Sequence, residues 1–272
     1  MGRVLEPEVM EGDAEAAAYD ELDRLWGDVI FQGFAESAVR MGVRQGRVLD
    51  VGTGSGRIAI RLARLNPAFD IEAIDLSRSM LELGRANAAR EGVRNLKFLP
   101  GDAKQIPYED DAFDLVICHQ LLHQLPDPVV ALREIDRVVK PQGAILVRDV
   151  RRLPEPVMTL VLPLWCLGYS AKLREQTMAS FRAGLTRNEF RALIRDAGIQ
   201  RAHVRTHLLT HQSIERVAIP YQPAAGSRLP RYPFGVRAMK RWFVSDPGIR
   251  RTSPAAAAAA TYVSAAANFF VG

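Results

Sequence analysis

The stretch from residue 47 to residue 56, Arg-Val-Leu-Asp-Val-Gly-Thr-Gly-Ser-Gly, constrains the fold more than any other part of this chain. Its first half is apolar enough for a short buried strand. Its second half is rich in glycine, and residues 58–65 then carry apolar side chains at helical spacing. A strand, a glycine loop and a helix in this order form the first unit of a doubly wound parallel sheet, which binds ligands outside the carboxyl ends of its strands. We therefore predict an α/β fold with a ligand site at this loop.

A second apolar run, residues 70–74, ends in Asp75. At the tip of the neighbouring strand this carboxylate is placed to accept hydrogen bonds from two ribose hydroxyls, which indicates a nucleoside cofactor. The glycines Gly52, Gly54 and Gly56 have the spacing G-x-G-x-G, whereas a dinucleotide fingerprint reads G-x-G-x-x-G. An NAD-dependent enzyme is therefore only a minor alternative.

Residues 48–56 instead resemble motif I of the class I S-adenosylmethionine (SAM) dependent methyltransferases. Four later segments follow in the order and at the spacing of that family, and the match is close to its ubiquinone/menaquinone-type branch. One departure, Gln142 where Lys-Pro-Gly-Gly is usual, falls in an expected turn and leaves the expectation of cofactor binding unchanged. The four segments resemble the ribose segment (75–81), the adenine segment (101–103), the fourth strand (113–119) and the helix before strand five (132–141).

The resemblance implies SAM as the cofactor and assigns a part of it to each segment. The backbone of the glycine loop would meet the methionine and ribose, Asp75 would bind the ribose hydroxyls, and Asp102 would accept from the adenine amino group. For Asp75 and Asp102 the alternative is a capping or turn role. The expected cofactor-binding residues are Gly52, Thr53, Gly54, Asp75, Leu76, Met80, Asp102, Ala103, His119 and Gln120.

Two histidines directly follow the fourth predicted strand, at the expected junction of cofactor and acceptor. His119 or Gln120 is expected to contact the cofactor, and His123 is the candidate general base, because imidazole titrates near neutral pH. The alternative for His123 is a buried, hydrogen-bonded helix residue. A zinc helix would need a glutamate at the second position of this motif, where Gln120 stands. Methyl transfer from a sulfonium requires no metal, and we expect none.

The composition is that of a globular protein, with 48% hydrophobic and 25% charged residues among 272. The two cysteines, Cys118 and Cys166, lack the spacing of a zinc site or a redox pair and are too few for the neighbouring arsenite methyltransferases. Together with the lack of a secretory signal they predict a cytoplasmic protein. The run at 157–171 is too short and broken for a membrane span.

The net charge of +5 belongs to the last 52 residues. Residues 221–272 hold seven Lys or Arg side chains and one Asp, so the rest of the chain is close to neutral. A basic arm outside the fold is no argument for nucleic-acid binding by the fold itself, and we expect no nucleic-acid partner. The arm is rich in proline and alanine and is a candidate for homo-oligomer contacts.

These observations predict a Rossmann-like, doubly wound seven-stranded sheet with an N-terminal helical cap and a C-terminal extension. The expected parts are a cap at 1–46, a SAM-binding domain at 47–220 with a lid insertion at 157–185, and the arm at 221–272. Residues 1–12 are expected to be irregular and 13–39 to be helical. The expected strands are 47–51, 70–74, 96–100, 114–118, 144–150, 200–206 and 213–219.

The predicted function is transfer of a methyl group from SAM to a small acceptor. The apolar run 157–171, with Trp26, Phe31 and Phe34, favours a hydrophobic or aromatic acceptor. Two alternatives stay open. One is a SAM-binding scaffold or regulatory protein without turnover. The other is a methyltransferase that acts on its own or a partner's C-terminal arm.

Overall fold

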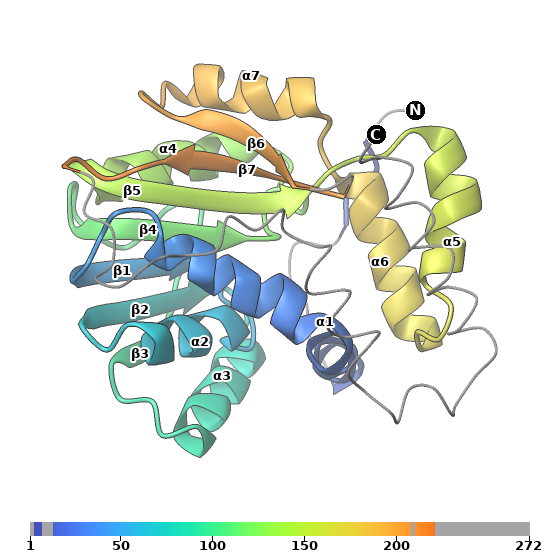
Figure 1. Ribbon diagram of the computed structural model, residues 1–272, viewed down its shortest axis with the longest axis horizontal. Helices are drawn as coiled ribbons and strands as arrows, with labels where there is room; N and C mark the ends of the chain where they lie inside the picture. The colour runs from blue at the N-terminus through green and yellow to red at the C-terminus, as the bar shows by residue number, and fades with distance from the viewer. Residues whose placement is uncertain (1–2, 7–12, 208–209, 221–272) are drawn as a thin grey trace.

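The computed structural model describes residues 3–6, 13–207 and 210–220 (Figure 1). The C-terminal arm at 221–272 lies outside the described residues. One seven-stranded sheet has the order β3-β2-β1-β4-β5-β7-β6, and its first five strands in the chain are parallel. This confirms the Rossmann-like α/β prediction. The strands are β1 (Gly46–Val51), β2 (Phe69–Asp75), β3 (Leu96–Pro100), β4 (Phe113–His119), β5 (Val139–Val150), β6 (His203–His207) and β7 (His211–Arg216).

Helices cover both faces of the sheet because the side chains of its strands alternate between two apolar clusters. Val48 and Ile117 pack in the cluster beneath α1 (Asp13–Val39), α2 (Arg57–Leu65) and α3 (Arg78–Arg90). Leu49 and Val116 pack in the cluster beneath α4 (Pro128–Val138) and α7 (Arg187–Ala197). The strand order reverses between β1 and β4, and in such sheets the ligand crevice lies at this switch point.

Helix starts and stops follow local sequence signals. The Ser77 hydroxyl accepts from the Met80 amide at 3.3 Å and begins α3, as its sequence predicts. Thr186 and Glu189 form a reciprocal capping box at the start of α7, and Gly198, with φ 80°, ends that helix. The predicted helix from residue 13 to residue 39 is confirmed as α1.

The structure corrects two boundaries. Asp127 caps α4, which begins at Pro128 and ends at Val138, three residues before the end of the segment 132–141 that resembles the family's helix before strand five. Strand β5 then begins at Val139, which pairs with Phe113 across a register shift, so the expected turn at 141–143 lies inside the strand. A buried β-branched residue favours this pairing over another helical position.

The two last predicted strands form an antiparallel hairpin, and their limits differ from the predicted ones. Strand β6 begins at His203 because Arg201 has φ 60° and turns the chain first. Strand β7 ends at Arg216, after which Ala218 and Ile219 donate their amides to the carbonyls of Met41 and Gln142 and leave the ladder.

The segment after β5, which includes the predicted insertion at 157–185, is helical. It contains η1 (Val157–Val161), α5 (Leu162–Trp165) and α6 (Ala171–Ala183). Figure 1 shows α5 and α6 beyond the carboxyl ends of β4 and β5. The ring of Trp165 lies 5.8 Å from that of Trp26 on α1, so the insertion packs on the N-terminal helix. Across the described ranges, no helix is both long and apolar enough to cross a membrane.

Candidate functional site

The glycine loop joins β1 to α2 and has a backbone that other residues rarely adopt. Gly52 and Gly54 have φ angles of 70° and 54°, in the left-handed region that favours glycine. A Cβ atom on Gly54 would meet nothing within 4 Å, so this part of the backbone faces open space. The loop therefore leaves room for a ligand to approach the main chain.

Asp75 holds this loop from the end of β2. Its Oδ2 accepts from the Gly54 amide at 2.8 Å, and its Oδ1 accepts from the Ser77 amide at 2.9 Å. Burial raises the pKa of this carboxyl group above its ordinary value. A carboxylate has about four lone-pair sites, so Asp75 keeps the capacity to accept a hydrogen bond from a ligand.

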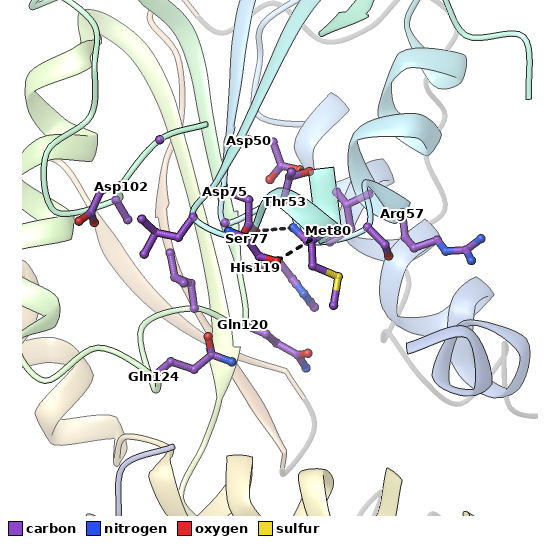
Figure 2. Close-up of a pocket in the computed structure, with 18 of the residues that line it drawn as sticks. Asp50, Thr53, Arg57, Asp75, Ser77, Met80, Asp102, His119, Gln120 and Gln124 are labelled. Carbon is purple, nitrogen blue, oxygen red and sulfur yellow. Dashed lines mark hydrogen bonds between the residues drawn. The ribbon is translucent and has the colours of Figure 1, made fainter. Parts of the chain in front are cut away.

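One cavity collects all ten predicted cofactor residues at the carboxyl ends of β1, β2, β3 and β4 (Figure 2). Further lining residues were assigned no cofactor role from the sequence. One of them is Phe31 on α1, and the sequence predicts this side chain to lie on the acceptor side. The lining residues are Phe31, Asp50, Gly52, Thr53, Gly54, Ser55, Arg57, Ile58, Asp75, Leu76, Ser77, Met80, Gly101, Asp102, Ala103, His119, Gln120, Leu121, Gln124 and Leu125.

Asp50 is the most informative residue that sequence reasoning missed. It is the only charged side chain within the predicted first strand after Arg47, and that break in an apolar pattern is a signal for a functional group. Its Oδ2 accepts from the Thr53 hydroxyl at 2.7 Å, and burial raises its pKa to about 7. A carboxyl group with this pKa beneath the loop changes charge near neutral pH.

Asp75 and Asp102 line the cavity together with two apolar side chains, Leu76 and Met80. Leu76 is 43% exposed and Met80 is buried, so the two present apolar surface on one side. The Oδ1 atom of Asp102 accepts from the Lys104 amide at 2.8 Å, and the Lys104 ammonium lies 3.1 Å from the same atom. Asp102 thus has a turn contact, as the alternative predicted, and also faces the cavity.

His119 ends β4 against two aromatic rings of α1. Its ring lies 4.7 Å from that of Phe34 and 6.2 Å from that of Phe31, both edge to face. Burial, with the charge of Arg148, holds the pKa of His119 well below its ordinary value, so the imidazole is neutral. Its Nε2 is buried without a hydrogen-bond partner in the described part of the chain. A buried polar atom in this state is an open position for a ligand group.

Gln120 lies beside His119 with a strained backbone. Its φ is 56°, an uncommon value for a residue with a side chain, and its amide donates to the Arg148 carbonyl at 2.8 Å. Its Nε2 lies 3.1 Å from Nε2 of His211, whose pKa burial lowers to about 3. Such strain persists where surrounding contacts fix it and is frequent at binding sites.

His123 does not line the cavity. Its imidazole is 2% exposed and lies between two carboxylates, with Nδ1 2.6 Å from Oδ1 of Asp149 and Nε2 3.4 Å from Oε2 of Glu6. Burial alone would lower the pKa of His123, but Asp149 and Glu6 outweigh it and raise the pKa to about 9. This placement favours the buried, hydrogen-bonded alternative over the general base.

Among the residues that the structure describes, no group of three or more His, Cys, Asp or Glu side chains could hold a metal ion.

Trp26 is expected from the sequence to lie on the acceptor side. It packs on Trp165 and is not among the lining residues of the cavity.

Comparisons with known proteins identify the family of the chain. The profile of the methyltransferase domain family matches residues 43–198, more than half of the chain. Demethylmenaquinone methyltransferase of Staphylococcus aureus is 37% identical over 127 residues, which are 46% of this chain and 52% of the relative. The chain therefore aligns with about half the length of the curated relatives it matches.

Solved structures agree on the fold. A SAM-dependent methyltransferase from Aquifex aeolicus has a TM-score of 0.57 at 18% identity, covering 77% of this chain and 100% of its own. A protein from Methanococcus maripaludis has a TM-score of 0.58 at 22% identity, covering 79% and 98%. With the family match over residues 43–198, the chain belongs to the class I SAM-dependent methyltransferase family, whose methyl donor is S-adenosylmethionine.

Proposed function

We propose that this protein is an enzyme that transfers a methyl group from SAM to a small acceptor of hydrophobic or aromatic character. One observation carries the proposal. The ten residues predicted from separate motifs, between Gly52 and Gln120 in the sequence, all line one cavity. Short motifs that match by chance would have no reason to meet at the ends of four strands.

The residues of the cavity fit the cofactor. Asp75 would accept from the ribose hydroxyls, Asp102 would accept from the adenine amino group, and Leu76 and Met80 would flank the adenine. The open backbone at Gly54 fits a ligand that lies against the main chain. When bound, SAM supplies a methyl group that its positive sulfur has already activated. The remaining tasks of the protein are alignment of the acceptor and exclusion of water.

The other lining residues support the proposed nature of the acceptor. Phe31, Leu121 and Leu125 give the cavity an apolar side, and His119 packs between this side and Phe34. The demethylmenaquinone methyltransferases among the relatives also support a hydrophobic acceptor. His123 as a general base stays a prediction, one that its distance from the cavity does not favour.

Product formation with a panel of acceptors tests this proposal. The full chain is incubated with SAM and with naphthoquinols, catechols or polyketide-like phenols, and S-adenosylhomocysteine (SAH) is quantified by mass spectrometry. We expect SAH to form only when a hydrophobic or aromatic acceptor is present. Binding of SAM without SAH formation across the panel would instead support the scaffold alternative. One added methyl group in the intact mass of the chain would support methylation of its own arm.

The division into a cap at 1–46, a SAM-binding domain at 47–220 and an arm at 221–272 is part of the proposal, as is a lid role for 157–185. The position of α5 and α6 beyond the sheet supports that lid role. Self-association through the arm and a cytoplasmic location stay predictions.

A further inference from the structure

Residues 3–6 connect two elements that lie far from them in the sequence. The Nη2 atom of Arg3 lies 3.0, 2.7 and 2.8 Å from the carbonyl oxygens of Leu122, His123 and Leu125. Its Nε donates to the Ala183 carbonyl at 2.8 Å, at the end of α6. One guanidinium therefore ties the loop after β4 to the end of the helical insertion.

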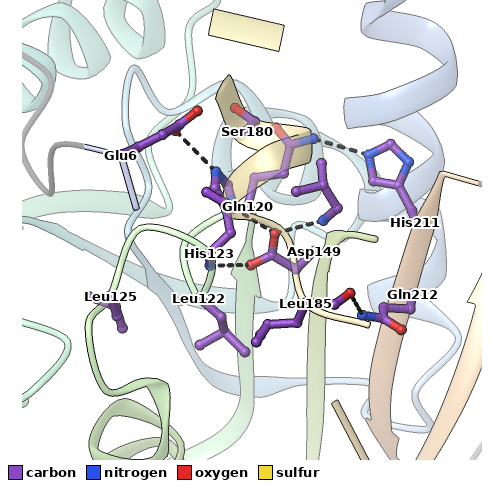
Figure 3. Close-up of polar contacts among 12 residues, drawn as sticks. Glu6, Gln120, Leu122, His123, Leu125, Asp149, Ser180, Leu185, His211 and Gln212 are labelled. Atoms are coloured by element: carbon purple, nitrogen blue, oxygen red, sulfur yellow. Dashed lines mark hydrogen bonds and ion pairs between the residues drawn. The ribbon is translucent and has the colours of Figure 1, made fainter. Parts of the chain in front are cut away.

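Glu6 adds a buried charge to this connection (Figure 3). Its side chain is 6% exposed, and its Oε2 lies 3.4 Å from Nε2 of His123. Within the described ranges neither carboxylate oxygen of Glu6 accepts a hydrogen bond. A buried carboxylate is costly unless a nearby opposite charge compensates it, and the His123 imidazolium is in position to do so.

Asp149 holds the other side of the same imidazole. Its Oδ1 lies 2.6 Å from Nδ1 of His123, and its Oδ2 accepts from the His123 amide at 3.1 Å. Asp149 is on β5 and fully buried, so it is a fixed anchor in the sheet. Glu6, His123 and Asp149 thus link residues 3–6 to the sheet through the loop.

The loop after β4, residues 120–125, forms one wall of the cavity. Gln120, Leu121, Gln124 and Leu125 line the cavity, while His123 points away from it toward Glu6 and Asp149. Arg3 and Glu6 therefore contact this loop at His123, which faces away from the cavity, while neighbouring residues of the loop line the cavity.

We propose that residues 3–6 are a strap that positions the cavity wall, with Arg3 and Glu6 as positioning residues for cofactor binding. This rests on the proposed function, since it assumes that the cavity takes SAM. Neither residue lines the cavity, so loss of the strap is expected to change affinity without removing any cofactor contact.

The charges around His123 make the strap depend on pH. The groups that act on its imidazole are Glu6 from the strap, Asp149 from β5, and the neutral imidazoles of His119 and His211, while Arg3 donates to its backbone carbonyl. The two carboxylates raise the pKa of His123 to about 9 against the effect of burial. The ion pair with Glu6 is therefore lost as pH rises through that value.

The test is calorimetric titration of the full chain with SAH between pH 7 and pH 10. In Glu6→Gln we expect affinity at pH 7 to fall about three- to thirtyfold. We also expect the pH at which affinity is lost to fall by about one unit, because one of two carboxylates near His123 is gone. The matched control is Glu175→Gln, an exposed glutamate on α6, which should follow the wild type. Comparison with the wild type cancels the titration of the SAH amino group itself.

Arg3→Ala is the second variant, which keeps the inference testable if Glu6→Gln does not fold. It leaves both carboxylates in place, so we expect weaker SAH binding without a transition at lower pH. Glu6→Asp, which restores the carboxylate, should recover part of the affinity. Wild-type binding by Glu6→Gln or by Arg3→Ala at every pH would overturn the strap alone. No SAH binding by the wild type would overturn the strap and the proposed function together.

Discussion

Replacement of Asp75 by alanine is expected to abolish tight cofactor binding. The carboxylate already accepts from the Gly54 and Ser77 amides at 2.8 and 2.9 Å, so it is fixed in position before a ligand arrives. Two further hydrogen bonds from ribose hydroxyls to a charged acceptor are worth about 1.5–3 kcal/mol each. Their loss corresponds to about a 10²- to 10⁴-fold rise in the dissociation constant for SAH. Calorimetric titration of the purified variant measures this change.

Two controls separate a local effect from a general one. Asp70→Ala removes the same side chain from an exposed position on the same strand, where its partner Lys97 is 3.7 Å away, and should bind SAH as the wild type does. Asp75→Asn keeps one acceptor oxygen and should lie between the wild type and Asp75→Ala. If a folded Asp75→Ala protein bound SAH within about threefold of the wild type, the ribose assignment would be refuted.

Four other substitutions test neighbouring parts of the site and of the fold. Gly52→Ala places a methyl group in a left-handed conformation and 2.9 Å from Leu121, so urea unfolding should show a loss of about 1–2 kcal/mol and SAH binding should weaken. Gly92→Ala, with φ 68° and open space, should lose similar stability with unchanged binding. Burial raises the pKa of Asp50 from 3.8 to about 7, so the folded protein keeps a proton that the unfolded chain releases. The contribution of Asp50 to stability should therefore fall as pH rises from about 4 to about 7. In urea titrations at both ends of this range, the wild type should lose stability relative to Asp50→Asn by this contribution. Thr186→Ala removes a capping box and should cost about 1 kcal/mol by the same measurement, without effect on binding.

Local signals predicted most of the fold. The strand, glycine loop and helix around Gly54, the Ser77 cap and the Thr186 cap depend on residues within a few positions of one another. The predicted limits of a strand were wrong where a residue far away in the sequence determines them. Val139 joins β5 because Phe113 lies beside it, and β7 ends at Arg216 because the next amides bond to Met41 and Gln142.

The same difference between local signals and distant contacts explains which parts of the site could be predicted. The ten residues expected to bind the cofactor could be named from the sequence because each belongs to a short motif, and the fold brings these motifs to one cavity. The surroundings of His123 could not be predicted, because Asp149 and Glu6 reach it from the sheet and from the N-terminal segment, and only the folded chain brings the three together. Asp50 appears in the sequence as one residue of a strand, and its raised pKa arises from the burial that folding imposes.

Parallel titration of the wild-type protein with SAH, SAM and NADH tests the central claim most directly, since that claim is the identity of the ligand in the cavity. We expect SAH and SAM to bind at a single site and NADH not to compete with them. A folded protein that binds NADH, or that binds none of the three, would contradict this expectation.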